Sequence, residues 1–174
     1  MADGISSIGR RQKKLRTYYD RPVPDELVMQ LLTAAHWAPS AGNLQPWRFY
    51  VIKNKEMQKE ICEKCYPAPW IKKAPLLIVL AADQNKSSWR YHERGAELYC
   101  LQDTAAAIQN LLLCSESLGL GSCWIGAFSE ESCSQILHLE EDLRPVAIIS
   151  IGYAAENPAG PGRASLEEAI VWIE

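Results

Sequence analysis

The sequence lacks the patterns that mark membrane, exported and nucleic-acid-binding proteins. No apolar run approaches the roughly 20 residues needed to span a bilayer, and the stretch Met1–Gly4 carries no charged-then-apolar signal pattern. The formal net charge of −3 gives no electrostatic reason to expect nucleic acid as a partner. We therefore expect a cytoplasmic protein. Its 174 residues, 48% hydrophobic and 22% charged, are typical of one globular domain over residues 1–174.

The chain also lacks the short motifs of several common hydrolase, metalloenzyme and nucleotide-binding classes. Gly-x-Ser-x-Gly and His-Glu-x-x-His do not occur, and neither does Gly-x-Gly-x-x-Gly or a phosphate-binding P-loop. The three histidines, His36, His92 and His138, stand outside any motif, so we interpret each as structural or exposed rather than catalytic. If the protein is an enzyme, a bound cofactor is expected to carry the reaction.

Cysteine is present, but not in a metal-binding or disulfide pattern. The six cysteines are irregularly spaced, and only Cys62 and Cys65 form a Cys-x-x-Cys pair. A zinc site would normally need a second such pair. The spacing also matches one helical turn, so we favour buried thiols that behave as small hydrophobes. A metal or redox role for this pair is the alternative.

Hydrophobic periodicity predicts alternating helices and strands. Helices are predicted over 25–38, 55–64, 93–118, 129–137 and 165–172, and strands over 47–53, 76–82, 122–128 and 146–151. The run Leu76–Ala82 is continuously apolar, which is typical of a strand covered on both faces. Thr104–Ala107, in the longest helix, has little bulk and fits either a tightly packed core helix or a homodimer interface. These patterns predict an α+β domain with a central sheet.

A loop of small and polar residues joins the first of these helices to the first strand. Pro39 and Gly42 break the helix, and Pro46 biases Gln45 towards an extended conformation. Small residues let the backbone approach a flat polar ligand, and Ser, Asn and Gln side chains can hydrogen-bond its rim. On these residues alone, a ligand loop and an ordinary helix-to-strand turn are equally good interpretations.

The second informative segment is cationic. Five of the seven residues from Arg10 to Arg16 are Lys or Arg, and such a cluster is costly unless solvent or an anion compensates it. The ordinary interpretation is a solvated basic face. The functional one is a phosphate clamp, because Arg and Lys form charge-assisted hydrogen bonds with phosphate.

Together these segments resemble the nitroreductase family of FMN-dependent oxidoreductases, in its short single-domain form. The matching stretches, in family order, are Arg16–Pro24, Trp37–Phe49, Gln102–Asn110, Gly119–Gly126 and Pro145–Gly152. The resemblance implies an α+β, nitroreductase-like fold with a mixed or antiparallel central sheet flanked by helices. It also implies an interlocked homodimer with FMN at the subunit interface, which favours the dimer interpretation of Thr104–Ala107.

The resemblance implies three groups of FMN-binding residues. The cations near the phosphate, the ribityl chain and flavin N1 and O2 would be Arg10, Arg11, Lys13, Lys14, Arg16 and Arg163. The loop reaching over the partner's flavin would supply Pro39, Ser40, Ala41, Asn43 and Gln45. The segment along the ring would be Trp124, Ile125, Gly126 and Ala127. A backbone N–H near Gly126 would be directed at flavin N5, so no side chain is expected to be catalytic.

The chain departs from the family pattern at two places. The family usually reads Arg-Arg-Ser-x-Arg/Lys where this chain has Gln12–Arg16. Either Lys13 and Lys14 take over the phosphate contact, or the chain shifts so that Arg10 or Arg11 does. Ala68 stands where the family often has an amide at the ring edge.

The activity implied is hydride transfer from NADH or NADPH, by way of FMN, to a nitroaromatic, a quinone or a similar small electrophile in a ping-pong cycle. Trp70, Trp89 and Tyr91 are candidates to line the acceptor side, with ordinary packing as the alternative. A specialised relative is also possible: a reductive dehalogenase, an enone reductase or a flavin-consuming enzyme. So is a non-catalytic flavin-binding or redox-sensing dimer that uses Cys62 and Cys65. Metal, nucleic acid and membrane are not expected as partners.

Overall fold

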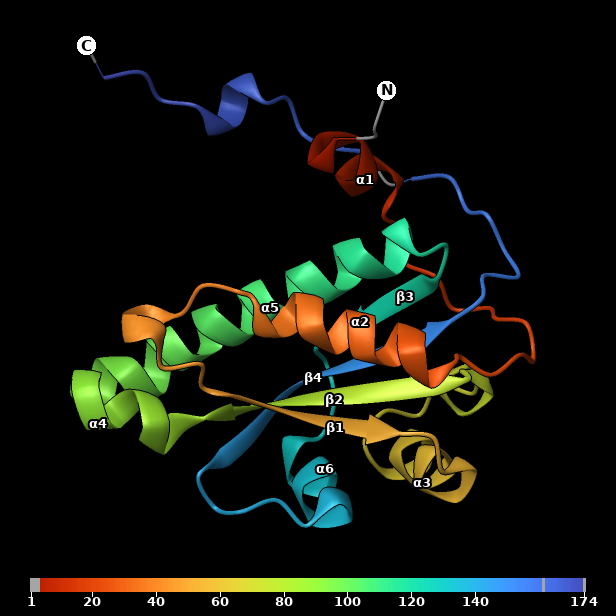
Figure 1. Cartoon of the computed structure of the whole chain (residues 1–174), viewed down its shortest axis with the longest axis horizontal. Coiled ribbons are helices and arrows are strands. Elements are labelled where there is room, and N and C mark those ends of the chain that lie inside the picture. The colour runs from red at the N-terminus through yellow and green to blue at the C-terminus, as the bar shows by residue number, and fades with distance from the viewer. Residues whose placement is uncertain (1–3, 161, 174) are drawn as a thin grey trace.

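The computed structural model describes residues 4–160 and 162–173, which form a sheet with helices on both faces (Figure 1). In the order in which they lie side by side, its strands are β1 (Trp47–Ile52), β2 (Leu76–Asp83), β4 (Leu143–Gly152) and β3 (Gly121–Ile125). Each neighbouring pair is antiparallel. The expected α+β class is therefore confirmed, with a sheet that is antiparallel rather than mixed in the described part of the chain.

Helices make up much of the rest of the described chain. They are α1 (Ile5–Arg11), α2 (Asp25–His36), α3 (Lys55–Lys64), α4 (Gln84–Arg94), α5 (Cys100–Ser117) and α6 (Glu130–Leu137). Helices α2 and α5 cover one face of the sheet, and α3 and α6 cover the other (Figure 1). None of the described helices is long and apolar enough to cross a membrane.

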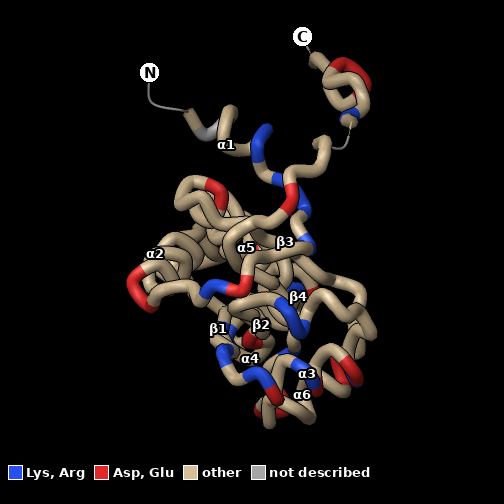
Figure 2. Tube along the Cα trace, turned by 90° about the vertical axis from the view of Figure 1, so that its right-hand side faces the viewer, with Lys and Arg blue, Asp and Glu red and all other residues tan. Residues whose placement is uncertain are grey.

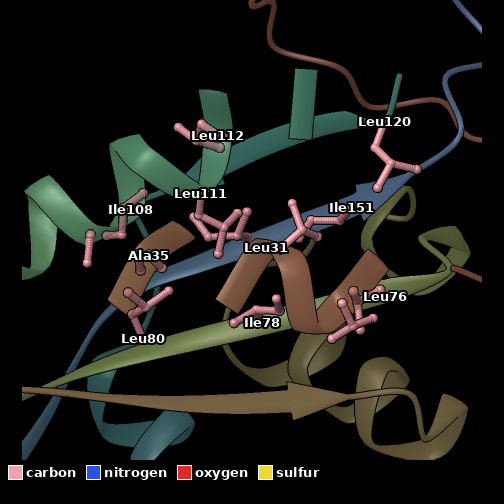
Figure 3. Packing of buried hydrophobic residues seen from close by; sticks show 14 of the residues in the cluster. Leu31, Ala35, Leu76, Ile78, Leu80, Ile108, Leu111, Leu112, Leu120 and Ile151 are labelled. Atoms are coloured by element: carbon pink, nitrogen blue, oxygen red, sulfur yellow. The ribbon is translucent and has the colours of Figure 1, made fainter. Parts of the chain in front are cut away.

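Strand β2 lies at the centre of the core because both of its faces are covered. Leu76, Ile78 and Leu80 point towards α2 and α5, where they meet Leu31 and Leu111 (Figure 3). The alternate side chains, Leu77 and Val79, pack into the second cluster, beneath α3 and α6. Each fully buried aliphatic side chain of this kind contributes about 1.5–3 kcal/mol. The predicted strand with two covered faces is confirmed.

Several predicted elements match the structure closely. The helix expected over 55–64 is α3, the one expected over 25–38 is α2, and the strand expected over 47–53 is β1. Helix α6 begins after Ser129, whose hydroxyl accepts the Ser132 N–H, as a capping serine does. The strand expected over 122–128 ends earlier, at Ile125.

The helix predicted over 93–118 is confirmed in its bounds, but it is not one regular α-helix. Helix α5 begins at Cys100, after a π-helical turn over Gly95–Tyr99 and after α4, which periodicity did not predict. His92, at φ 53° and ψ −142°, breaks the regular conformation near the end of α4, and the helical conformation resumes after it. A Cβ at Gly95 would lie 2.3 Å from the Ser87 carbonyl oxygen, so glycine permits the close contact that this broken helix makes.

The prediction of a C-terminal helix over 165–172 was wrong. The described residues there contain only a 3₁₀ turn, Glu167–Ala169, and Ser165 bonds the Glu167 side chain. The following side chains of Val171, Trp172 and Ile173 are exposed. Most helical stability in proteins comes from packing an apolar face, and these residues pack little against their own chain.

Candidate functional site

The cationic segment runs along the open edge of β3. The Leu15 N–H donates to the Ser122 carbonyl oxygen at 3.1 Å, and Lys14 forms a parallel bridge with Ser122. Leu15 is buried, and a Cβ at Gly121 would lie 2.6 Å from its Cδ1. Leu15 therefore anchors the segment, while Lys14 and Arg16 stay exposed. Figure 2 shows Lys and Arg along the trace that leaves α1 and passes beside β3.

Two further contacts fix the backbone of this segment. The Tyr18 hydroxyl donates to the Leu15 carbonyl oxygen at 2.7 Å and also contacts Ser150, and burial raises the pKa of Tyr18. The Glu156 carboxylate accepts the backbone N–H of Arg16 at 2.6 Å and that of Thr17 at 2.9 Å. The Arg16 N–H bond is the main cause of the lowered pKa of Glu156. The side chain of Arg16 is thus left to act elsewhere.

The predicted phosphate cations do not all point the same way. Arg10 and Arg11 end α1, and Arg11 pairs with Glu116, Nε to Oε1 3.5 Å. Lys13 Nζ donates to Asn157 Oδ1 at 2.8 Å. Lys14 and Arg163, distant in sequence, line one cavity together. The structure therefore brings Lys14 and Arg163 into one place and directs Arg11 towards α5.

This cavity has a volume of about 320 Å³. It is lined by charged and polar side chains together with two apolar ones: Gln12, Lys13, Lys14, Gln109, Leu112, Ser122, Trp124 and Arg163. A second hollow of about 290 Å³ also has Trp124 in its lining, together with Gly126 and Arg144. The two hollows therefore share one lining side chain, that of Trp124 in β3.

The Trp124–Ala127 segment crosses from strand to loop within this region. Trp124 is 37% exposed, whereas Ile125 is buried in the cluster beneath α3 and α6. A Cβ placed on Gly126 would have only Trp124 Nε1 within 4 Å, at 3.9 Å. The backbone at Gly126 is therefore open to a flat molecule lying against the end of β3.

The loop from Pro39 to Gln45 is ordered by its own polar groups. Ser40 Oγ accepts the Gln45 N–H at 2.9 Å, and the Gln45 amide donates to the Asn43 carbonyl oxygen at 3.0 Å. Gly42, Asn43 and Gln45 have positive φ angles of 59°, 55° and 51°. Such backbone angles are uncommon for non-glycine residues and cluster at functional sites. The loop is a defined structure rather than a plain connection.

Asp103 of α5 holds the middle of this loop. Its carboxylate accepts the Ala41 N–H at 3.1 and 3.2 Å. Burial raises the pKa of Asp103, and the bond to Ala41 partly offsets the rise. Asp103 lay within a stretch that resembles the family, but its residue type alone indicated no partner. Sequence reasoning assigned it no role.

Within one chain, the loop and the cationic cavity lie apart. Asp103 is in the first turn of α5, whereas Gln109 and Leu112 of the cavity lie further along the same helix. At 1.5 Å per residue, Gln109 and Leu112 are roughly 9 and 14 Å along the axis from Asp103. Figure 1 shows the loop beside α4, away from the end of α5 that approaches α1. Within one chain, the predicted FMN-binding residues of the loop therefore do not reach the cavity of that same chain.

The candidate aromatics divide between these two places. Trp70 lies beneath the Arg16 guanidinium, 5.6 Å from ring centroid to Cζ. Tyr91 packs edge-on against Tyr99 with ring centroids 5.1 Å apart, and its hydroxyl would be 2.8 Å from a Cβ on Gly42. Trp89 is exposed on α4. Trp70 thus belongs with the cationic segment and Tyr91 with the loop.

The cysteines and histidines have structural surroundings. Cys62 and Cys65 are both buried in the cluster beneath α3 and α6, and Cys62 Sγ donates to the Ala68 carbonyl oxygen at 3.1 Å. His36 Nδ1 accepts the Trp47 indole N–H at 3.2 Å. Among the described residues, no group of three or more His, Cys, Asp or Glu side chains is placed to hold a metal ion.

Comparison with known proteins gives consistent matches along the chain. The model described as "Nitroreductase family" matches residues 9–68 and 57–153. A relative from Methanothermobacter thermautotrophicus, provisionally named NADH dehydrogenase/NAD(P)H nitroreductase, is 33% identical over 168 residues, 91% of this chain and 84% of that protein. An FMN reductase of NAD(P)H type from Bacillus subtilis is 29% identical over 84% of this chain and 64% of its own.

Solved structures match over nearly the full length. A provisionally named nitroreductase from Desulfovibrio desulfuricans, crystallised in complex with FMN, has a TM-score of 0.86 and 27% identity, covering 100% of this chain and 99% of that one. A structure from Bacteroides thetaiotaomicron has a TM-score of 0.85 and 27% identity, covering 99% and 98%. The fold and the sequence therefore point to the same family.

Proposed function

This chain belongs to the nitroreductase family, and from that membership we propose that it is an FMN-dependent oxidoreductase. It would take hydride from NADH or NADPH and pass it to a quinone, a nitroaromatic compound or another small electrophile, with the donor leaving before the acceptor binds. The observation that carries this proposal is the cavity lined by Lys14, Arg163 and Trp124, which shares Trp124 with the hollow that the open backbone of Gly126 lines.

The residues of this cavity fit the chemical parts of FMN. Lys14 and Arg163 offer positive charge to a phosphate, with Lys13 beside them. Gln12 and Gln109 add polar groups suited to a ribityl chain, and Trp124 offers a flat apolar surface to a ring. This donor set supports Lys14 and Arg163 over Arg10 and Arg11 as the phosphate ligands.

When bound, FMN would supply the acceptance and donation of hydride. The protein's own groups would orient the ring and balance its charge. Arg16 is exposed next to β3, and a fixed cation there would stabilise negative charge that builds up during reduction. The open backbone at Gly126 lets reactants approach the ring edge. No protein side chain needs to exchange a proton, which agrees with the structural contact between His36 and Trp47.

A homodimer completes the proposed site. The loop from Pro39 to Gln45 is rigid but distant from its own cavity, so it is suited to cover the cavity of a second copy. Two exposed apolar features support such a pairing: the C-terminal side chains of Val171, Trp172 and Ile173, and Trp37, which is 81% exposed beside the loop. Ala105 and Ala106 of α5, only partly buried, allow another helix to approach closely.

The proposal is tested by adding FMN and then a donor under anaerobic conditions. Purified protein should be yellow, or become so with FMN, and NADH or NADPH should bleach the flavin absorbance near 450 nm. A quinone or nitroaromatic compound should then restore it. Protein that does not bind FMN would contradict the cofactor assignment. Bound flavin that neither donor reduces would instead support a non-catalytic flavin-binding dimer.

A further inference from the structure

Arg16 is exposed, and its guanidinium has a defined contact with an aromatic ring. Its guanidinium lies over the ring of Trp70, with 5.6 Å between Cζ and the ring centroid. Its backbone N–H is fixed separately by Glu156 at 2.6 Å. A long side chain on a fixed backbone still samples many rotamers in water. The aromatic face of Trp70 therefore limits where the charge of Arg16 resides.

Trp70 itself is anchored by the core. It packs against the buried cluster beneath α3 and α6, and it meets Tyr66 edge-on with centroids 6.5 Å apart and planes at 73°. Directly after it, Ile71 is completely buried, and its N–H donates to the Ala68 carbonyl oxygen at 3.0 Å. The ring under Arg16 is thus held by packing that does not depend on Arg16.

The charge of Arg16 acts on β3, the strand that leads to Gly126. Burial raises the pKa of the Cys123 thiol, and the positive charges of Lys14 and Arg16 partly offset that rise. Cys123 neighbours Trp124 of the cavity wall. Arg16 directly follows Leu15, whose N–H donates to the Ser122 carbonyl oxygen of β3 at 3.1 Å, so its charge lies beside that strand.

We propose that Trp70 is a positioning residue that holds Arg16 in place and thereby raises the reduction potential of bound FMN. This inference rests on the proposed function. Hydride transfer from NAD(P)H brings two electrons and one proton to the ring. A C–H bond of the donor would break and an N–H bond would form on the ring, so that the donor becomes NAD(P)⁺ and the ring gains one negative charge. A localised cation stabilises that charge more than a mobile, hydrated one does.

The test measures the reduction potential of the flavin in holoenzyme variants. Trp70→Leu removes the aromatic face, and Trp70→Phe keeps a weaker one. We expect Trp70→Leu to weaken binding of reduced FMN relative to oxidised FMN by up to about tenfold, which lowers the potential by about 30 mV. Trp70→Phe should give a smaller shift in the same direction. Affinity for oxidised FMN should change less than twofold in both.

A double-mutant cycle distinguishes an effect of Trp70 that acts through Arg16 from a general loss of packing around Trp70. If Trp70 acts through Arg16, Trp70→Leu should not shift the potential further in an Arg16→Leu background. Tyr50→Leu is the matched control, because Tyr50 packs against the same cluster from β1, and it should leave the potential unchanged. If Trp70→Leu does not fold, Trp70→Phe with Arg16→Leu completes the cycle.

Three results would overturn the inference. They are an unchanged potential in both Trp70 variants, shifts that add fully to that of Arg16→Leu, and an equal shift in Tyr50→Leu. Failure of the proposed function gives a different result, because the unmodified protein would then bind no FMN or resist reduction by NAD(P)H.

Discussion

Single side chains determine the shape of the Pro39–Gln45 loop before any ligand is present. The Ser40 hydroxyl and the Asn43 carbonyl oxygen accept hydrogen bonds from Gln45. The Asp103 carboxylate, outside the loop, accepts the Ala41 N–H. A loop fixed in this way loses little conformational entropy when it meets a ligand. At this scale the residues act by holding backbone, and their substitution should weaken binding more than it weakens the fold.

The first prediction concerns Ser40. In Ser40→Ala the Gln45 N–H loses an acceptor at a partly buried position, which costs about 1 kcal/mol. We expect FMN affinity to fall about fivefold, as that energy implies, with a small loss of thermal stability. Ser40→Thr keeps the hydroxyl and should bind almost as wild type does. Flavin fluorescence titration measures both, and equal affinities in Ser40→Ala and wild type would refute the loop's role.

The second prediction concerns pH and Asp103. Burial raises the pKa of Asp103 in the folded chain, so the folded state binds a proton more tightly than the unfolded state does. Protonated Asp103 therefore stabilises the folded state at low pH. This contribution is lost as pH rises from the ordinary aspartate pKa of about 3.9 through the raised pKa of the folded chain. Asp103→Asn does not titrate, yet it keeps an oxygen acceptor for the Ala41 N–H.

Urea unfolding at a series of pH values tests this directly. The stability of wild type should fall relative to that of Asp103→Asn across this acid window, by about 1.4 kcal/mol for each unit of pKa shift. Above the folded pKa the difference should stay constant. Parallel stability curves through the whole window would show that Asp103 has no raised pKa in the folded protein.

At the scale of elements, local signals predicted the structure where packing agreed with them. The predicted helix over 55–64 is α3, and the apolar run 76–82 becomes β2. Helix α4 was missed because its residues are mostly polar and show no apolar stripe. The break at His92 depends on the contact between Gly95 and Ser87, which no periodicity encodes. The helix predicted over 165–172 did not form, because the described apolar side chains there are exposed and pack little against the rest of the chain.

The third prediction tests the cap of α3. Asn54 Oδ1 accepts the Met57 N–H at 3.0 Å, so Asn54→Ala should cost about 1 kcal/mol and lower Tm by roughly 2–4 °C. Asn54→Asp keeps the acceptor and adds a favourable charge at the helix start, so its Tm should stay near that of wild type. Identical melting of all three proteins would mean that the cap does not stabilise the folded state.

At the scale of the whole molecule, the candidate site is incomplete in one chain. Lys14 and Arg163 meet in space although nearly the whole chain separates them in sequence. Their proximity depends on the path of the chain after β4, and local patterns do not specify that path. The phosphate role of the cations and the division of the site between two subunits came from resemblance to a family. The residues by themselves left both questions open.

The fourth prediction is complementation between two inactive variants. Gly42→Val should distort the loop, because Gly42 has φ 59° and a Cβ there would lie 2.8 Å from the Tyr91 hydroxyl. Lys14→Glu should repel the phosphate. Each variant alone should bind little FMN. After unfolding and refolding together in equal amounts, about half of the dimers should be mixed, so about a quarter of all sites should be intact.

Flavin content after gel filtration measures the recovery. The control mixes two preparations of Gly42→Val, which should recover nothing. If the mixed sample also recovers nothing while mixed dimers form, the loop serves its own chain and the shared-site proposal fails.

Helix α5 has a consequence for how this protein can change over generations. Asp103 fastens the loop near one end of α5, and Gln109 and Leu112 line the cavity further along it. In the proposed dimer, this helix fixes the distance and the rotation between the loop that it fastens and the cavity that it lines. One inserted residue between them would rotate one half-site by about 100° relative to the other. Insertions and deletions should therefore accumulate in the surface connections, while the length of α5 between Asp103 and Gln109 stays fixed.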